Sequence, residues 1–141
     1  MGAEKMTQQA AKLSTRIADT IMRQCREDGY HPYPLERWAY VPGMLLMAMA
    51  RAGVQLGDDR YFDFMRLHMD YYIAEDGTIR TYSLEEYNLD QINQGKNLFM
   101  LLERGGDARY AKAADTLAAQ LIGQPRTSEG GFWHKKIYPF Q

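Results

Sequence analysis

A five-residue motif occurs twice in the chain, and its spacing constrains the fold more than any other feature. Gly57-Asp-Asp-Arg-Tyr61 recurs as Gly106-Asp-Ala-Arg-Tyr110, roughly fifty residues later. Each copy follows a mostly apolar segment and opens an amphipathic one. A repeat of this length is typical of stacked helical hairpins, in which inner and outer helices alternate. We expect Asp58 and Asp107 to cap outer helices, and the Arg and Tyr of each copy to pack between hairpins.

Apolar residues recur every three or four positions along most of the chain, which predicts helices. The predicted helices cover residues 7–27, 38–53, 59–74, 88–104 and 107–122. Segments 38–53 and 88–104 are the predicted inner helices. The first is apolar on nearly every side, so we expect it to be buried on every side. Residues 78–83 are the one candidate for a short extended segment.

Alternating inner and outer helices are compatible with an open α-solenoid or with a closed ring of hairpins. The apolar character of both inner helices favours the ring, which would need about 300 residues for six hairpins. The 141 residues form one domain by size and supply a little over two hairpins. The predicted fold is therefore all-α, an incomplete α/α toroid of about five helices.

Composition and motif searches exclude several classes of function. A net charge of -1 gives no field that would attract nucleic acid or a membrane surface. The single Cys25 excludes an internal disulfide, and no ligand spacing indicates a metal site. The chain has no phosphate-binding glycine loop and no serine-nucleophile motif. The N-terminus has no apolar signal core, so we expect a cytoplasmic protein. Because the motifs that hold metals and phosphates are missing, we also expect no cofactor.

Asp90 is the candidate catalytic carboxylate. It lies in the first turn of the predicted helix 88–104, and the amides of Asn93 and Gln94 follow at helical spacing. One interpretation is a charge that interacts favourably with the helix dipole. The other is a carboxylate at the mouth of a ring, where it can bind hydroxyl groups or transfer protons.

Three further residues are candidates for ligand binding. His134 follows Phe132-Trp133 in a glycine-flanked loop, where it is either a binding residue or simply a packed one. Trp38 and Tyr40 lead into the first inner helix and carry rings able to stack on a sugar, although core packing is the alternative for Trp38. Aromatic rings, an acid, amides and a histidine together indicate a carbohydrate ligand.

Three segments of the chain resemble one family of enzymes. They are Arg37–Tyr40 with Gly43, Asn88–Gly95, and the long run Pro125–Lys135 followed by Tyr138-Pro139. The chain resembles the unsaturated rhamnogalacturonyl hydrolases, which form glycoside hydrolase family 105 and are related to the unsaturated glucuronyl hydrolases of family 88. The resemblance covers essentially the whole chain and implies an (α/α)6 six-hairpin barrel. Residues 1–141 would be the N-terminal part of that single domain.

The resemblance also implies a reaction and a set of residues. These enzymes act in the cytoplasm on unsaturated oligosaccharides left by pectin lyases, and they release the unsaturated uronic acid from galacturonyl-rhamnose units. An Asp protonates the C4=C5 enol ether and water adds at C5, which differs from direct displacement at the anomeric carbon. By motif, Asp90 matches the acid that contacts the sugar and assists the catalytic acid. His134 and Tyr40 match residues of the uronate pocket, and Trp38 lies beside them.

One departure from the family affects the expected activity. In the family, Tyr-Pro-x-Gln continues into a Met-Trp-Leu-Asp-Gly segment whose Asp is the main general acid and base. The 141 residues end at Gln141, so we expect little or no hydrolase activity from them. The alternative is a non-catalytic helical-hairpin module that binds a ligand or assembles. In either case, inner helices 38–53 and 88–104 would be left exposed and would favour self-association.

Overall fold

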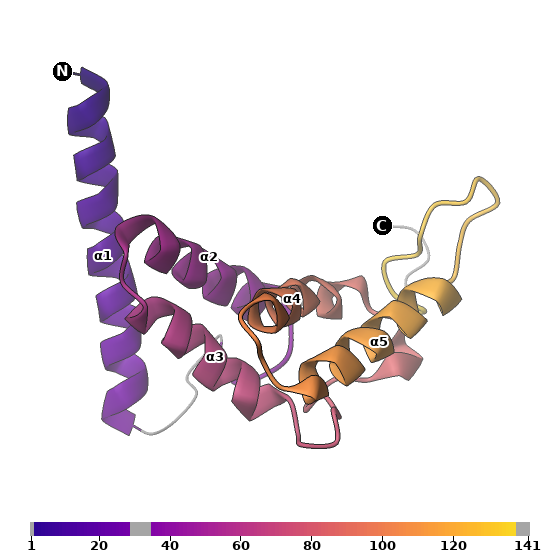
Figure 1. Cartoon of the computed structure of the whole chain (residues 1–141). Coiled ribbons are helices and arrows are strands. Elements are labelled where there is room, and N and C mark those ends of the chain that lie inside the picture. The colour runs from indigo at the N-terminus through magenta and orange to yellow at the C-terminus, as the bar shows by residue number, and fades with distance from the viewer. Residues whose placement is uncertain (1, 29–34, 138–141) are drawn as a thin grey trace.

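The computed structural model describes residues 2–28 and 35–137, and helices dominate that part of the chain (Figure 1). The α-helices are α1 (Gly2–Asp28), α2 (Tyr40–Leu56), α3 (Arg60–Tyr72), α4 (Lys96–Glu103) and α5 (Ala108–Gly123). Short 3-10 turns precede α4: η1 (Leu84–Glu86), η2 (Leu89–Gln91) and η3 (Asn93–Gly95). Isolated β bridges join Ile73 to Ile79 and Arg126 to Phe132.

The helices form an open arc of two hairpins with α1 at one edge (Figure 1). Helix α2 packs against α3, and α4 packs against α5. The two hairpins meet through α2 and α4, which form the inner layer. Helices α2 and α4 run parallel. Gly43, near the start of α2, lies close to Gln94, just before α4. Further along both helices, Met47 and Arg51 line the same groove as Met100. The hairpin architecture predicted from the repeat is thereby confirmed.

The first inner helix is longer and less enclosed than predicted. It ends at Leu56 instead of Gly53, because Gly57 adopts the left-handed conformation (φ +66°) and donates its N–H to the carbonyl of Gly53. Its buried side includes Leu46, Met49 and Ala50. The expectation that it is buried on every side is wrong, because the side chain of Met44 is 53% exposed.

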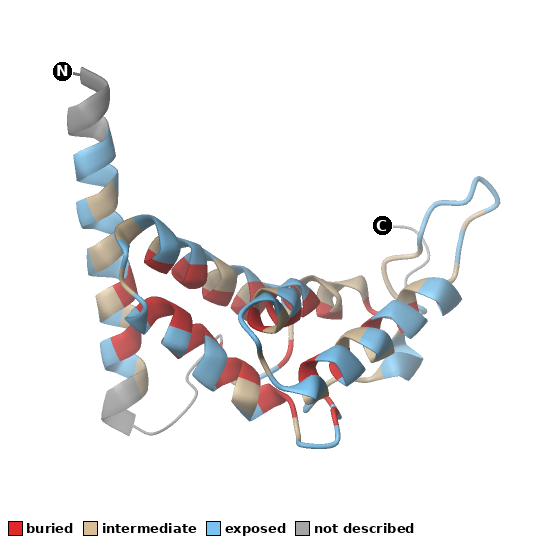
Figure 2. Cartoon of the chain, viewed as in Figure 1, coloured by how far each residue is buried: buried red, intermediate tan, exposed pale blue. Residues whose placement is uncertain are grey.

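The hydrophobic core lies between the helices, where the buried residues face one another (Figure 2). Trp38 is central to it: its ring packs edge-on against Tyr72, with ring centroids 5.8 Å apart. The Trp38 Nε1–H donates to the carbonyl oxygen of Gln91 at 2.6 Å, and the Tyr72 hydroxyl donates to Leu35 O at 2.6 Å. The polar atoms of both rings are thus satisfied inside the core. No helix among the described residues combines the length and apolarity needed to cross a membrane.

The second inner helix was predicted to span residues 88–104, and this prediction is wrong in its first half. The α-helix begins only at Lys96, and the tight turns η2 and η3 replace the preceding part. Gly95 lies so close to Leu117 that a Cβ there would be 2.5 Å from its Cδ1. The Gln94 side chain accepts from the backbone of Ala39 at 3.0 Å. These tertiary contacts accompany 3-10 turns in place of a regular α-helix.

The predicted extended segment at residues 78–83 is likewise not a strand. Only Ile79 forms a bridge there, and Thr81 adopts a positive φ of 61° that breaks the extended backbone. The Thr81 hydroxyl accepts from the backbone N–H of Trp38 at 2.8 Å, which ties this segment to the start of α2.

The predicted cap is confirmed in the second copy of the repeated motif and displaced by one residue in the first. Asp107 is the N-cap of α5, and its side chain accepts the N–H of Arg109 at 2.9 Å. The N-cap of α3 is Asp59, which makes no side-chain cap bond, while Asp58 just before it accepts the N–H of Arg60 at 3.1 Å.

The Arg and Tyr of each copy bind an aspartate on the preceding outer helix. The Tyr61 hydroxyl donates to Asp19 of α1 at 3.0 Å. In the second copy, both the Tyr110 hydroxyl and the Arg109 guanidinium donate to Asp70 of α3. We call these two aspartate–tyrosine contacts the repeat contacts. They confirm that the motif packs between successive outer helices.

Candidate active site

The structure brings Asp90 and His134 together although they come from distant parts of the chain. Asp90 lies in η2 and His134 lies in the loop after α5, with 3.4 Å between Asp90 Oδ2 and His134 Nε2. Lys135 Nζ lies 3.4 Å from the same oxygen. The Asp90 and His134 side chains are each 31% exposed, so a ligand can reach them. The site therefore offers a carboxylate, an imidazole and an ammonium group to one ligand.

The position of Asp90 weakens the helix-dipole interpretation. A charge at the start of a long helix would interact with the helix dipole, but α4 begins six residues after Asp90. Asp90 instead follows Asn88, whose side chain accepts the Asp90 N–H at 3.0 Å. Asn88 is thus the N-cap of η2. It holds the carboxylate in a tight turn at the N-terminal end of the inner layer.

Backbone hydrogen bonds pair the segment around Asp90 with the segment around His134. The N–H of Leu89 donates to the carbonyl of His134 at 3.0 Å, and the N–H of Lys136 donates to the carbonyl of Glu86 at 3.0 Å. The first bond joins the residue before Asp90 to His134 itself, and the second continues the same pairing away from Asp90. The side chains are therefore held by main-chain pairing as well as by their own charges.

The loop that carries His134 is itself a tight turn. The N–H of Thr127 donates to the carbonyl of Gly131 at 2.8 Å, and Gly130 has a φ of +86°, a conformation that glycine adopts without strain. The N–H of Trp133 donates to the carbonyl of Pro125 at 2.9 Å and returns the chain toward α5. The glycine pair noted in the sequence thus shapes the turn that precedes His134.

Two buried glutamines, Gln120 on α5 and Gln124 just after it, bind the backbone of the segments that carry Asp90 and His134. The sequence analysis did not identify them. Gln124 donates to the carbonyls of Tyr87 and Trp133, and Gln120 donates to the carbonyl of Asn88. Burial raises the pKa of Tyr82 to about 12, so its hydroxyl stays protonated and donates to Gln120 at 2.8 Å. The signal in the sequence was a pair of amides one turn apart beside an apolar stripe.

Tyr40 and Trp38 are placed differently from Asp90 and His134. Tyr40 is the first residue of α2 and its side chain is 44% exposed. The hydrogen bond from Ala39 to Gln94 joins this end of α2 to the turns that carry Asp90. Trp38 is 1% exposed and offers no face on which a sugar could stack. Of its two interpretations, core packing is the one that the structure supports.

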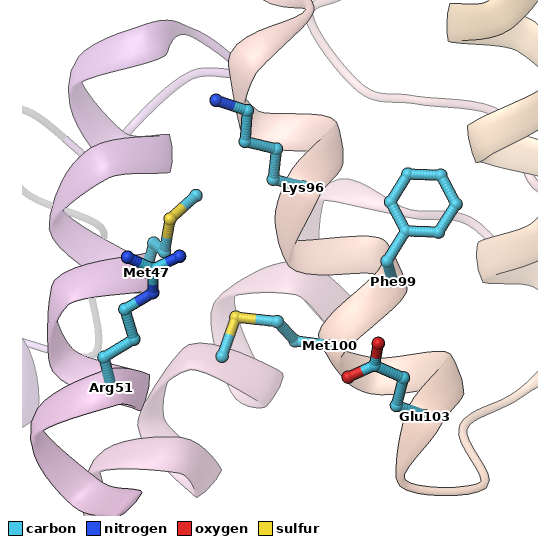
Figure 3. Close-up of a pocket in the computed structure, with 6 residues that line it drawn as sticks. All are labelled: Met47, Arg51, Lys96, Phe99, Met100 and Glu103. Atoms are coloured by element: carbon cyan, nitrogen blue, oxygen red, sulfur yellow. The ribbon is translucent and has the colours of Figure 1, made fainter. Parts of the chain in front are cut away.

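A groove of about 450 Å³ lies along the inner layer between α2 and α4 (Figure 3). It is lined by Met47, Arg51, Lys96, Phe99, Met100 and Glu103. None of the candidate site residues lines it. The described residues also contain no cluster of three His, Cys, Asp or Glu side chains that could hold a metal ion.

Parallel inner helices, with an acid and a histidine at their shared N-terminal end, define part of an α/α toroid with a polar site at one mouth. Residues 13–141 match the family model described as Glycosyl Hydrolase Family 88, and the chain belongs to this family. It is also similar to a solved glycoside hydrolase from family 105 of C. acetobutylicum ATCC 824, with 40% identity and a TM-score of 0.79. The similarity predicted from three sequence segments is confirmed.

The match to the C. acetobutylicum structure covers 89% of this chain and 33% of that one. The chain thus spans about a third of the length of that relative. The fold is accordingly all-α: helical hairpins of an (α/α)6 barrel, which here form an incomplete toroid of five α-helices among the described residues.

Proposed function

We propose that these 141 residues are the N-terminal part of a single α/α-toroid domain in a carbohydrate-active hydrolase. The substrates would be unsaturated oligosaccharides derived from pectin, met in the cytoplasm. Membership of family 88 and the similarity to a family 105 glycoside hydrolase support the class of reaction. The contact between Asp90 and His134, at the mouth of the inner layer, is the observation that carries the proposal.

The proposed substrate is an unsaturated galacturonyl-rhamnose unit. In its hydration, a proton adds to C4 and the water oxygen adds to C5 of the enol ether. The resulting hemiketal opens, the glycosidic bond breaks and the rhamnose is released. Asp90 would accept hydrogen bonds from sugar hydroxyls and assist the proton transfer. His134 and Lys135 supply donors for the anionic uronate, and the exposed ring of Tyr40 lies at the same end of the inner layer.

We assign Asp90 a binding and assisting role and place the main proton transfer elsewhere in the domain. The resemblance puts the principal acid in a Met-Trp-Leu-Asp-Gly segment, which these 141 residues do not contain. Loss of one member of a cooperating pair of acids removes most of the catalysis that the pair provides. The 141 residues are therefore proposed to bind the sugar without turning it over.

Titration with an unsaturated galacturonyl-rhamnose disaccharide tests the proposal. NMR shifts should report binding, and Asp90→Asn or His134→Ala should weaken it about tenfold or more, because each removes a charged or polar contact. The absorbance of the enol ether should stay constant. Asp63→Asn is a matched control, since Asp63 is an exposed acid on α3 that pairs with Arg66.

Two outcomes would contradict this proposal. Equal affinities for Asp90→Asn and Asp63→Asn would remove Asp90 from the site. A steady loss of enol-ether absorbance on adding the purified 141 residues would show that the main acid is not needed.

The second candidate is a non-catalytic helical-hairpin module that assembles with other chains. The groove between α2 and α4 favours it, because apolar side chains beside the groove are exposed: Met44 at 53% and Phe99 at 58%. Such exposed apolar surface on a small domain often marks an interaction site.

A further inference from the structure

Gln124 lies where α5 ends, between the two segments that form the site, and its side chain is 3% exposed. Its Nε2 donates to the carbonyl of Tyr87 at 2.7 Å and to the carbonyl of Trp133 at 2.8 Å. A primary amide has two N–H donors, so both are used. One holds the chain three residues before Asp90, and the other holds the residue immediately before His134. We propose that Gln124 is a positioning residue that sets the geometry between Asp90 and His134.

Gln120 fixes the orientation of Gln124. Its Nε2 donates to the Gln124 side-chain oxygen at 3.1 Å and to the carbonyl of Asn88 at 3.1 Å. Its own side-chain oxygen accepts from the Tyr82 hydroxyl. If the Gln124 amide were flipped, its oxygen would face two carbonyl oxygens, which is unfavourable. The network therefore admits one arrangement, and it is fully satisfied within the buried interior.

The backbone at Tyr87 explains why such a restraint is needed. Tyr87 has a positive φ of 46°, a conformation that non-glycine residues rarely adopt and that surrounding contacts must maintain. The Gln124 side chain donates to the carbonyl of Tyr87, and the N–H of Tyr87 donates to the carbonyl of Leu84 at 3.0 Å. Without the bond from Gln124, the backbone before Asp90 would be free to relax. The carboxylate would then move relative to the imidazole.

The second hydrogen bond of Gln124 holds the segment that carries His134. The carbonyl of Trp133 has Gln124 as its donor, and the next carbonyl, that of His134, accepts from Leu89. Gln124 thus acts on both segments from one buried point. The main-chain pairing remains when the side chain is removed, so the site should loosen without the helices unfolding.

Fluorine NMR of the 141 residues labelled with 5-fluorotryptophan gives a direct test. The chain has two tryptophans. Trp38 is in the core and Trp133 is bound by Gln124. Gln124→Leu should shift and broaden the Trp133 resonance and leave the Trp38 resonance unchanged. Gln124→Glu should have a larger effect, because it keeps the size of the side chain but presents acceptors to two carbonyl oxygens.

A matched control is Asn97→Leu, which removes another fully buried amide. Asn97 donates to the carbonyl of Gly43 at 3.1 Å and joins α4 to α2. This control should leave the Trp133 resonance in place. Gln124→Asn serves as a milder variant, since the shorter amide can reach only one carbonyl and should give an intermediate shift. Circular dichroism should show unchanged helix content throughout.

The inference rests on the proposed function, and sugar binding separates the two. In the disaccharide titration, Gln124→Leu should raise the dissociation constant about tenfold and Asn97→Leu less than about twofold. If the unaltered chain binds no disaccharide, the proposed substrate is wrong, while the fluorine spectra still decide the positioning role. An unchanged Trp133 resonance in Gln124→Leu and Gln124→Glu would overturn the inference. Equal shifts of both tryptophan resonances would overturn it as well.

Discussion

Gly43 shows how a single residue couples the inner layer to the site. A Cβ at this position would lie 2.7 Å from the Cα of Gln94, which belongs to the turn that follows Asp90. Backbone cannot yield in the way that the end of a flexible side chain can. The absence of a side chain at Gly43 therefore sets how closely α2 approaches the turns that carry the carboxylate.

Gly43→Ala should lower the free energy of unfolding by about 1–3 kcal/mol, because it overpacks a contact between two backbones. Urea denaturation measures the change. Gly131→Ala is the matched control: its new methyl would meet Thr127 at 3.4 Å, an ordinary contact, so its effect should stay within about 0.5 kcal/mol. If the two substitutions cost the same, the close approach at Gly43 has no energetic importance.

At this scale the sequence identified part of the site. Asp90 and His134 were singled out by residue type and motif, and the structure places them in contact. Gln124 was missed because its partners are main-chain carbonyls, which have no signature in the sequence. Lys135 lies within a segment that resembles the family, but only the fold shows that its ammonium group reaches Asp90.

At the scale of helices, the repeat contacts determine how one outer helix sits against the next. The aspartate on α1 accepts from Tyr61, and the aspartate on α3 accepts from Tyr110 and Arg109. In each copy the aspartate that accepts the hydrogen bond lies about forty positions before the tyrosine that donates it. The motif thus specifies both the start of its own helix and its register against the preceding one.

Asp70→Asn should lower the free energy of unfolding by about 1–3 kcal/mol, because two donors lose a charged acceptor. Asp19→Asn should cost less. Its tyrosine contact is similar, but its arginine partner, Arg60, is exposed and lies 3.7 Å away. Thermal unfolding of the two variants under identical conditions checks the order. A larger loss for Asp19→Asn would contradict this account of the repeat contacts.

The helices were predictable to different degrees for physical reasons. The outer helices at residues 59–74 and 107–122 differ from α3 and α5 by one or two residues, since an amphipathic period and a cap define each of them. The segment before α4 has a similar pattern in the sequence. There, however, amide side chains and Gly95 make contacts with distant elements that outweigh the local preference for helix.

For the molecule as a whole, the open arc leaves the inner layer incompletely covered. Met44 on α2 and Phe99 on α4 expose apolar surface next to the groove between these helices. Arg51 and Glu103 line the same groove and carry opposite charges. A second copy that packs there could bury the apolar groups and pair the charges.

We expect the purified 141 residues to self-associate, and Phe99→Glu should weaken the association about tenfold or more, because it places a charge in an apolar contact. Sedimentation velocity at several concentrations measures this. Leu67→Glu is the control, since Leu67 is equally exposed but lies on the outer helix α3. A monomer at every concentration would contradict the expectation and weaken the assembly alternative.

The pairing of the Asp90 segment with the His134 segment also has a consequence for synthesis of the chain. Asp90 leaves the ribosome about forty-five residues before the segment that carries His134 and Lys135. The delay corresponds to a few seconds of translation. During that interval Tyr87 lacks Gln124, and the carboxylate has neither His134 nor Lys135 beside it. The site can therefore acquire its final geometry only after residues 124–135 have been synthesised.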